Sequence, residues 1–300
     1  MNNFADLLIK EVLKKESSVV VGLDPNPDYF PLCLLDKGQS DIKTITDSIL
    51  AFNKMIIDVI HPHVLAVKPQ LAYYEVYGSY GIYALEQTIC YAKSKGLLVI
   101  NDAKRGDIGP TAIAYAKAFL GDSPLSGDAV TVNPYLGRDG ITPFLQERID
   151  RTKGIFVLLK TSNPSASDLQ DLQLKSGEKM YQRLAETLDH LAKDTMGHYG
   201  YSNLGVVVGA TYPQDASYIR SFLKHSLFLV PGYGAQGGKA EDLSCYFDEN
   251  GMGALISSTR AIIYSYMQHH EDWTNIDKNK IQESIEISTL QAKEEINAIR

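Results

Sequence analysis

The chain has few cysteines, no long apolar run and no excess of positive charge. Its three cysteines, Cys33, Cys90 and Cys245, lie far apart and show no CxxC or zinc-type spacing, which excludes a disulfide framework and favours a reduced, cytoplasmic protein. The apolar runs are short and broken by charge or glycine, so no transmembrane span is predicted. The formal net charge of −7 gives no basis for binding nucleic acid or an anionic membrane.

What remains is the composition of an ordinary globular protein. Hydrophobic residues make up 44% and charged residues 22% of the 300 positions, and a chain of this length can bury about three quarters of its unfolded surface. The first segment, MNNFADLLIKEVLKKESS, has no basic start followed by a long apolar core, so it predicts a short amphipathic helix rather than a leader.

Eight short apolar runs recur along the chain, and continuous runs of this kind are typical of strands that are covered on both faces. The runs are SVVVGLD ending at Asp24, VLAVKPQ at Gln70, LLVINDAK at Lys104, AVTVNP at Pro134, GIFVLLKTS at Ser162, LGVVVGA at Ala210, LFLVPG at Gly232 and ALISSTR at Arg260. Segments with helical spacing lie between them, among them residues 44–60, 72–95, 177–196 and 213–223. We therefore expect a crossover helix after each strand.

Eight βα units without a linker predict an α/β fold, a (β/α)8 TIM barrel that forms a single domain over residues 1–300, rather than an open doubly wound sheet. Extra helices are expected at both ends of the chain. The residues predicted to share one face of the C-terminal helix, against the outside of the barrel, are Ile281, Ile285, Ser288, Ala292, Ile296 and Ile299.

Polar residues collect where these runs end, which in a barrel of this kind is the end that carries the active site. They are Asp24, Lys68, Asp102, Lys104, Asn133, Ser162 and Arg260. Asp102 and Lys104 stand two apart on one strand, so their side chains should face the same side, and Lys68 on the preceding strand can approach the same point. The alternative is a buried ion-pair network that only fills the top of the barrel.

The seventh run leads into a loop with Gly232, Gly234, Gly237 and Gly238. Phosphate in this fold is commonly bound by backbone amides after strands seven and eight, and Arg260 would add a bidentate partner. Without that arginine, a flexible surface loop would explain the glycines equally well.

Histidines and tyrosines elsewhere favour structural roles. His61 and His63 precede the second strand, at the wrong end for catalysis, and His269 and His270 end a helix, where polar or cationic residues are favourable. A group of tyrosines has spacings that suit helix packing, with some at a dimer contact: Tyr73, Tyr74, Tyr77, Tyr80 and Tyr83.

The ordered motifs resemble the orotidine 5′-monophosphate decarboxylase family, in particular its longer subgroup, over nearly the whole chain. The most specific is NDAKRGDIGPT, Asn101 to Thr111, with its Asp-x-Lys-x-x-Asp-Ile pattern; VGLDP, AVKPQ, VTVNPYLG, LKTSNP, VPGYGAQGG and SSTR accompany it in order. The resemblance implies a cofactor-free lyase that converts orotidine 5′-monophosphate to uridine 5′-monophosphate, the last step of de novo pyrimidine nucleotide synthesis.

The resemblance also implies residue roles. Lys104 would protonate pyrimidine carbon six, Asp102 would lie beside the departing carboxylate and Lys68 would orient the charges. Asp107, with Ile108 and Thr111, would enter the active site of the other subunit of a homodimer. The implied substrate-binding residues are Asp24 for the ribose hydroxyls, Ser162 for the pyrimidine edge, Gln236 between base and phosphate, Pro231 beside them, and Arg260 with the amides of Gly237 and Gly238 for the phosphate.

Two rival functions fit parts of the same pattern. A magnesium-dependent phosphosugar decarboxylase of the same superfamily shares the Asp-x-Lys-x-x-Asp core, but it needs a further acidic ligand where this chain offers Lys68 and Asn133. A non-catalytic nucleotide-binding barrel would keep the phosphate site and has no need of Lys68, Asp102, Lys104 and Asp107 together. No metal site is expected from the sequence.

Overall fold

The strands of the chain close into a barrel. The computed structural model describes residues 3–35, 41–146, 152–234 and 240–300, and within them eight parallel strands follow one another around the barrel in sequence order. The strands are β1 (Val19–Leu23), β2 (Ala66–Pro69), β3 (Leu98–Arg105), β4 (Ala129–Val132), β5 (Gly154–Lys160), β6 (Ser202–Val208), β7 (Ser226–Pro231) and β8 (Ala254–Ser258). The predicted (β/α)8 architecture is confirmed.

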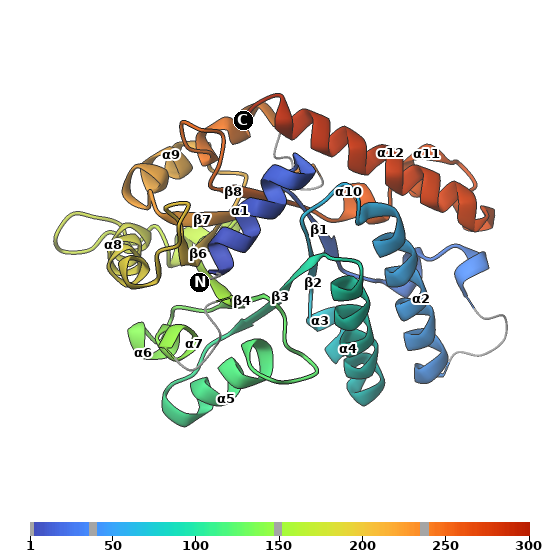
Figure 1. Cartoon of the computed structure of the whole chain (residues 1–300), viewed down its shortest axis with the longest axis horizontal. Coiled ribbons are helices and arrows are strands. Elements are labelled where there is room, and N and C mark those ends of the chain that lie inside the picture. The colour runs from blue at the N-terminus through green and yellow to red at the C-terminus, as the bar shows by residue number, and fades with distance from the viewer. Residues whose placement is uncertain (1–2, 36–40, 147–151, 235–239) are drawn as a thin grey trace.

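Helices surround this barrel (Figure 1). The α-helices are α1 (Phe4–Lys15), α2 (Ile42–Ile60), α3 (Ala72–Glu75), α4 (Gly78–Ser94), α5 (Gly109–Leu120), α6 (Arg138–Ile141), α7 (Pro143–Gln146), α8 (Met180–Ala192), α9 (Pro213–Phe222), α10 (Arg260–Ile263), α11 (Tyr266–His269) and α12 (Lys278–Asn297). The 3-10 helices are η1 (Pro27–Tyr29), η2 (Leu32–Leu34), η3 (Pro164–Asp168), η4 (Lys193–Thr195), η5 (Ala240–Tyr246) and η6 (Trp273–Asn275).

Both faces of the strands are buried, as the continuous apolar runs predict. On β1, Val19 and Val21 pack into the large apolar cluster beneath the surrounding helices, whereas Val20 points inward and joins a second cluster inside the barrel. Alternation along the strand thus sends successive β-branched side chains into two different cores.

Helix α1 closes the N-terminal end of the barrel. Its apolar face joins the interior cluster, and the Phe4 ring packs edge-on against Phe156 of β5 at 6.2 Å between centroids. Gly154 makes this approach possible, because a Cβ there would lie 2.1 Å from the Phe4 ring. Asn3 caps the helix by accepting a hydrogen bond from the Ala5 amide. The predicted N-terminal helix is confirmed, and it leaves the opposite end of the barrel for ligands.

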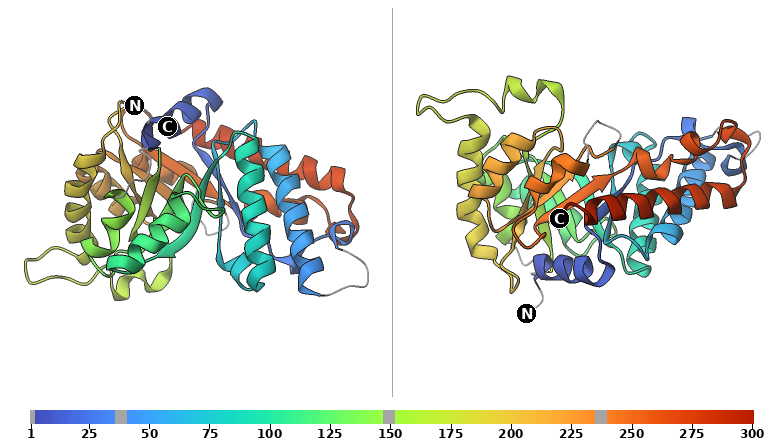
Figure 2. Two further views of the ribbon diagram at one scale, coloured as in Figure 1. Left: turned by 60° about the horizontal axis from the view of Figure 1, so that its bottom comes forward. Right: turned by 90° about the horizontal axis from the view of Figure 1, so that it is seen from above.

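Helix α12 runs along the outside of the barrel, against α2 and α10 (Figure 2). Its buried face consists of Ile281, Ser284, Ile285, Thr289, Ala292 and Ile296. The predicted face is therefore correct in its isoleucines and Ala292. Ser288 is only half-buried, and Ile299 follows the end of the helix but still packs against the same core.

The expectation of one crossover helix after each strand is only partly correct. The predicted helix over residues 72–95 is broken between α3 and α4, where Gly78 adopts a left-handed φ of +57°. Between β4 and β5 the described chain forms two one-turn helices, α6 and α7, and between β7 and β8 it forms the 3-10 helix η5. Among the described residues, no helix is long and apolar enough to cross a membrane.

Candidate active site

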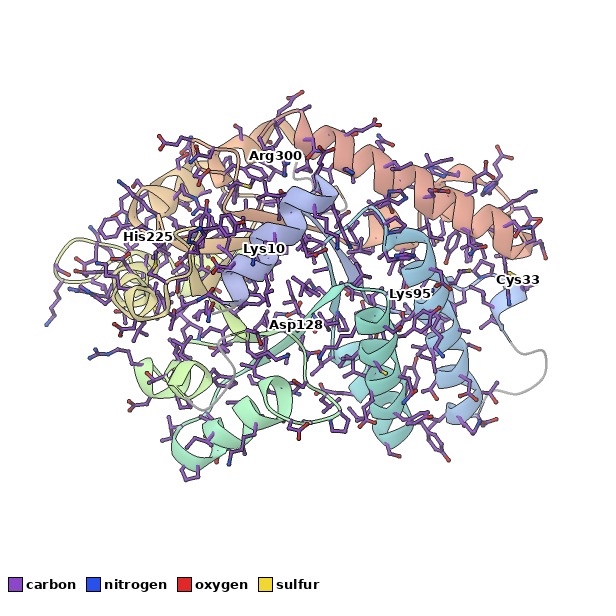
Figure 3. All side chains as sticks on the ribbon, viewed as in Figure 1. Lys10, Cys33, Lys95, Asp128, His225 and Arg300 are labelled. Atoms are coloured by element: carbon purple, nitrogen blue, oxygen red, sulfur yellow. The ribbon has the colours of Figure 1, made fainter. Side chains whose placement is uncertain are left out.

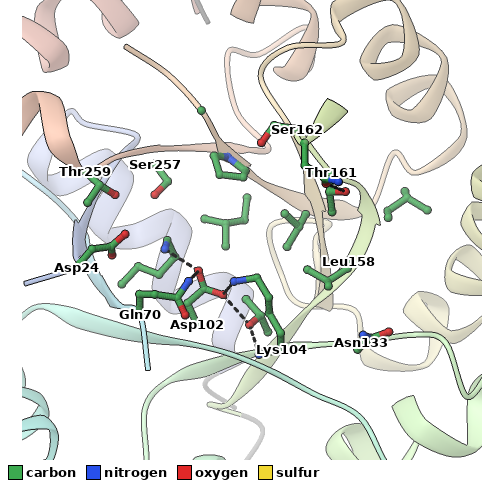
Figure 4. A pocket seen from close by; sticks show the side chains of 18 of the residues that line it. Asp24, Gln70, Asp102, Lys104, Asn133, Leu158, Thr161, Ser162, Ser257 and Thr259 are labelled. Atoms are coloured by element: carbon green, nitrogen blue, oxygen red, sulfur yellow. Dashed lines mark hydrogen bonds and ion pairs between the residues drawn. The ribbon is translucent and has the colours of Figure 1, made fainter. Parts of the chain in front are cut away.

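A cavity of about 810 Å³ opens at the C-terminal ends of the strands. The residues predicted at or just past strand ends meet in its lining: Asp24, Lys68, Asp102, Lys104, Asn133, Ser162, Pro231 and Arg260. Asp24 lies on the wall opposite Thr161 and Ser162, with Asp102 and Lys104 between them (Figure 4). The ends of seven different strands thus supply one site.

Asp102 is the centre of the charged array. Its Oδ2 accepts hydrogen bonds from Nζ of Lys68 at 2.8 Å and Nε2 of Gln70 at 3.0 Å. Its Oδ1 accepts from Nζ of Lys104 at 2.6 Å and from the Thr131 hydroxyl at 3.0 Å. The predicted convergence of Lys68, Asp102 and Lys104 is confirmed, and the carboxylate is held from both sides by cations.

Lys104 reaches this position through an unusual backbone. It is one of two described non-glycine residues with a left-handed φ, at +49°, a conformation that costs an L-residue on the order of 1–2 kcal/mol. The Lys104 amide donates to the Thr131 hydroxyl at 2.8 Å, which holds this turn in place. The prediction that Asp102 and Lys104 share a face is correct, although β3 is irregular at this point, because its register with β4 shifts between Asn101 and Arg105. Strain of this kind is typical of functional sites.

The charges around Asp102 shift the pKa values of Asp102 and Lys68. Burial by itself would raise the pKa of Asp102, but the ammonium groups of Lys68 and Lys104 outweigh it and hold that pKa well below the ordinary carboxyl value. Burial would likewise lower the pKa of Lys68, yet Asp102 and Asp24 raise it overall. Asp102 is therefore an anion and Lys68 a cation at neutral pH, and their titrations are coupled.

The array borders open space, which argues against the alternative of a purely structural ion-pair network. Lys68 and Asp102 are 5% and 8% exposed, whereas the Lys104 side chain is 44% exposed and faces the cavity. A network that only filled the barrel would not hold a cation against a solvent-filled cavity.

Asp24 has a different environment. Its Oδ1 is buried and accepts no hydrogen bond from any described residue. Burial raises its pKa, and the attraction of Lys68 offsets only part of that effect. A buried acceptor without a donor costs free energy in the absence of a ligand, so Asp24 is suited to accept hydrogen bonds from a bound molecule.

Several predicted residues lie elsewhere. Asp107 and Thr111 do not line the cavity of their own chain; Asp107 is half-buried and accepts a hydrogen bond from the Ile108 amide, and Thr111 is exposed in the first turn of α5. Gln236, Gly237 and Gly238 lie outside the described residues. Gly232 and Gly234, which precede them, adopt left-handed φ values of +107° and +76°.

Two side chains that bind Asp102 were not predicted from the sequence. Thr131 is 1% exposed and joins Asp102 to the Lys104 amide, and Gln70 adds a fourth donor to Asp102. The signal for Thr131 was present, because it is the polar residue at an inward position of the apolar run AVTV.

The other histidine and tyrosine predictions divide. His63 lies outside the cavity, with its ring 3.8 Å from Glu286 on α12, consistent with a structural role. Tyr74 is fully buried and its hydroxyl accepts a hydrogen bond from Asn53, whereas Tyr80 and Tyr83 are 49% and 56% exposed. Within the described chain, no cluster of three or more His, Cys, Asp or Glu side chains has the arrangement of a metal site.

Comparison with known proteins gives one consistent result. The profile of the Orotidine 5′-phosphate decarboxylase / HUMPS family matches residues 17–271. Proteins named orotidine 5′-phosphate decarboxylase from Caldicellulosiruptor bescii and Rhodopirellula baltica are each 41% identical to the chain, with 99% of both sequences covered. The solved structure of Leishmania donovani OMP decarboxylase is similar with a TM-score of 0.75 and 30% identity, over 99% of each chain.

Proposed function

Because the chain belongs to the orotidine 5′-phosphate decarboxylase family and is a carboxy-lyase, we propose that Lys104 protonates orotidine 5′-monophosphate at the carbon that loses carbon dioxide. The observation that carries this proposal is the Lys104 ammonium, held 2.6 Å from Asp102 at the edge of the cavity. The product is uridine 5′-monophosphate, so the enzyme supplies the last step of de novo pyrimidine nucleotide synthesis.

The chemistry requires a fixed positive charge. When the bond between pyrimidine carbon six and the carboxylate breaks, the electron pair stays on carbon six, where no adjacent carbonyl can accept it. A preorganised ammonium stabilises that charge without reorganisation of solvent. The Lys104 ammonium then donates a proton to form the new carbon–hydrogen bond, and it regains a proton from water. Asp102 holds the Lys104 ammonium in place through their ion pair.

Asp102 has a second proposed role. It is ionised because its pKa is depressed, so a substrate carboxylate beside it meets a negative charge. That repulsion disappears when neutral carbon dioxide leaves. Ground-state repulsion of this kind must be offset by binding energy from the rest of the nucleotide.

The remaining wall residues suit the other parts of the substrate. The unpaired acceptor of Asp24 fits the ribose hydroxyls, and Ser162 on the opposite wall fits the pyrimidine edge. Arg260, an exposed guanidinium at the cavity, fits the phosphate, together with Pro231, Gln236 and the amides of Gly237 and Gly238.

We further propose a homodimer. Asp107, Ile108 and Thr111 lie outside their own cavity, and Ile108 is 53% exposed. These residues are free to reach the site of a second copy, where Asp107 would extend the charge array. The exposed Tyr80 and Tyr83 support a contact between subunits.

We also propose that residues 1–300 form one domain, because α1 and α12 both pack on the barrel.

A cytoplasmic location is also proposed. Cys33 and Cys90 are free and exposed, and Cys245 is free. Cys33 lies on the outer edge of the molecule (Figure 3). Free accessible thiols are typical of a reducing compartment.

The donor set disfavours the magnesium-dependent rival. Both oxygens of Asp102 already accept hydrogen bonds, and two of the four donors are ammonium groups. A divalent cation would have to replace these donors at the Asp102 oxygens. It would then lie close to the positive charges of Lys68 and Lys104, and Coulomb repulsion opposes this. A non-catalytic barrel would not explain why Lys104 adopts a strained backbone conformation and faces the cavity.

One assay separates the three functions. Purified protein is added to orotidine 5′-monophosphate in the presence and absence of EDTA, and the pyrimidine absorbance is followed. The proposed function predicts turnover that EDTA leaves unchanged. No turnover in either condition would overturn the proposed function. The magnesium-dependent rival would then decarboxylate a phosphosugar acid only when EDTA is absent and magnesium is present, and the binding barrel would turn over neither substrate.

A further inference from the structure

The loop between β5 and α8 is fastened to the end of β5 by two adjacent residues. Gln170 binds Thr161 twice: its Oε1 accepts from the Thr161 amide at 2.9 Å, and its Nε2 donates to the Thr161 hydroxyl at 2.7 Å. The next residue, Asp171, accepts a hydrogen bond from Nζ of Lys160 at 2.6 Å. Gln170 and Asp171 of the loop thus bind Thr161 and Lys160, two adjacent residues at the end of β5.

Lys160 gives this attachment a rigid base. Its side chain is 1% exposed, and its ammonium lies 3.6 Å from Asp215 on α9 as well as beside Asp171. The rings of Tyr181 and Tyr212 lie 5.2 and 4.7 Å from the same nitrogen. A desolvated ammonium with this many partners has little freedom to move.

Ser162 directly follows Lys160 and Thr161 in the chain. On one side it packs against Gly209 of the β6 end, where an added Cβ would lie 2.7 Å from the Ser162 backbone, and the Gly209 amide donates to the Lys160 carbonyl at 2.7 Å. On the other side, the Thr161 hydroxyl donates to Asn163 at 2.7 Å. Gly209 therefore packs against the Ser162 backbone, and Gln170 holds Thr161, the residue before Ser162, in position.

The loop itself borders the cavity. Leu169 and Gln170 line it together with Thr161 and Ser162, while the rest of the loop projects away from the barrel (Figure 2). The side chain of Gln170 therefore lies within the cavity, while both polar atoms of its amide group bind Thr161.

We propose that Gln170 is a positioning residue for substrate binding: by its two hydrogen bonds to Thr161 it holds the Ser162 hydroxyl toward the pyrimidine edge, on the base that Lys160 and Asp171 provide. This inference rests on the role proposed for Ser162. We expect Gln170 to act through Ser162. If Ser162 is already held in place, less of the substrate's binding free energy is needed to order it when substrate binds.

The test is a double-mutant cycle with Gln170→Ala, Ser162→Ala and the double variant, measuring kcat, KM and the thermal midpoint. We expect each single variant to lower kcat/KM by about 10-fold or more, mainly through KM, and we expect Gln170→Ala to cost less than about two-fold once Ser162 is absent. Gln173→Ala is the matched control, because Gln173 is an exposed glutamine of the same loop whose side chain donates to the Gly177 carbonyl. It should leave kcat/KM unchanged.

Thr161→Val covers the case in which Gln170→Ala fails to fold. It is nearly isosteric and removes only the hydroxyl half of the contact, so a smaller loss that also vanishes in the Ser162→Ala background is expected. Unchanged kcat/KM in Gln170→Ala, or a loss that simply adds to that of Ser162→Ala, would overturn the positioning role. An unaffected Ser162→Ala variant would instead overturn the role proposed for Ser162, and absence of turnover in the parent would overturn the proposed function itself.

Discussion

Nζ of Lys104 lies 2.6 Å from Oδ1 of Asp102, two residues earlier in the chain. The other oxygen of Asp102 lies 2.8 Å from Nζ of Lys68, so one carboxylate binds two ammonium groups and holds them in fixed positions. Lys68 is enclosed and Lys104 borders the cavity. This asymmetry supports the proposed roles, in which Lys68 orients the charges and Lys104 donates the proton.

Replacing Lys104 with alanine should remove the proton donor and the positive charge together. We expect kcat to fall by about 10⁴-fold or more, while uridine 5′-monophosphate still binds with measurable affinity by calorimetry. Lys95→Ala is the control. Lys95 follows the end of α4, outside the cavity (Figure 3), and forms an ion pair of the same 2.6 Å length with Asp58 of α2. Undiminished turnover in Lys104→Ala would remove this residue from the mechanism.

Asp24→Asn should stabilise the free enzyme while weakening substrate binding. Burial raises the folded-state pKa of Asp24, so its ionisation costs stability. That cost is complete above the raised pKa, and it disappears as pH falls to the ordinary carboxyl value of about 3.9. At neutral pH the variant should be more stable, because its neutral amide removes the cost of burying a carboxylate charge.

The measurement for Asp24 is the thermal midpoint of both proteins between pH 7 and pH 4. The difference should be positive at pH 7 and narrow toward pH 4, while nucleotide affinity falls. Asp28→Asn, at an exposed carboxylate of η1, should change neither quantity. A destabilised Asp24→Asn variant would show that the charge of Asp24 contributes more to the array than its burial costs.

Arg260→Ala should separate phosphate binding from chemistry. Loss of a charge-assisted contact costs about 1.5–3 kcal/mol, so KM for orotidine 5′-monophosphate should rise by roughly 10- to 100-fold. Turnover of orotidine, which lacks the phosphate, should not change. Equal losses on both substrates would mean that Arg260 acts on the base or the ribose instead.

Complementation between two inactive variants tests the dimer. Lys104→Ala and Asp107→Ala subunits are mixed, dissociated and reassociated. If Asp107 serves the partner's site, each mixed dimer contains one native site, and an equal mixture should recover roughly a quarter of the parent activity. Activity no higher than that of the separate variants would mean that Asp107 acts within its own chain.

The sequence by itself determined the barrel and most of its site. Its eight apolar runs, each ending in polar or small residues, specify strands with two buried faces, and parallel strands necessarily bring those ends together. Asp24, Lys68, Asp102, Ser162 and Arg260 could therefore be assigned to one cavity before any distance was known. Local patterns carry this information because strand periodicity and strand direction are local properties.

Only the tertiary structure decided how the site is held. The Thr131 hydroxyl supports the left-handed turn at Lys104 across two strands, and Gln170 fastens Thr161 across a loop. The same holds for the unpaired oxygen of Asp24 and for the exclusion of Asp107 from its own cavity. These features depend on contacts between distant segments, and burial and hydrogen bonding between such segments arise only when the barrel has closed.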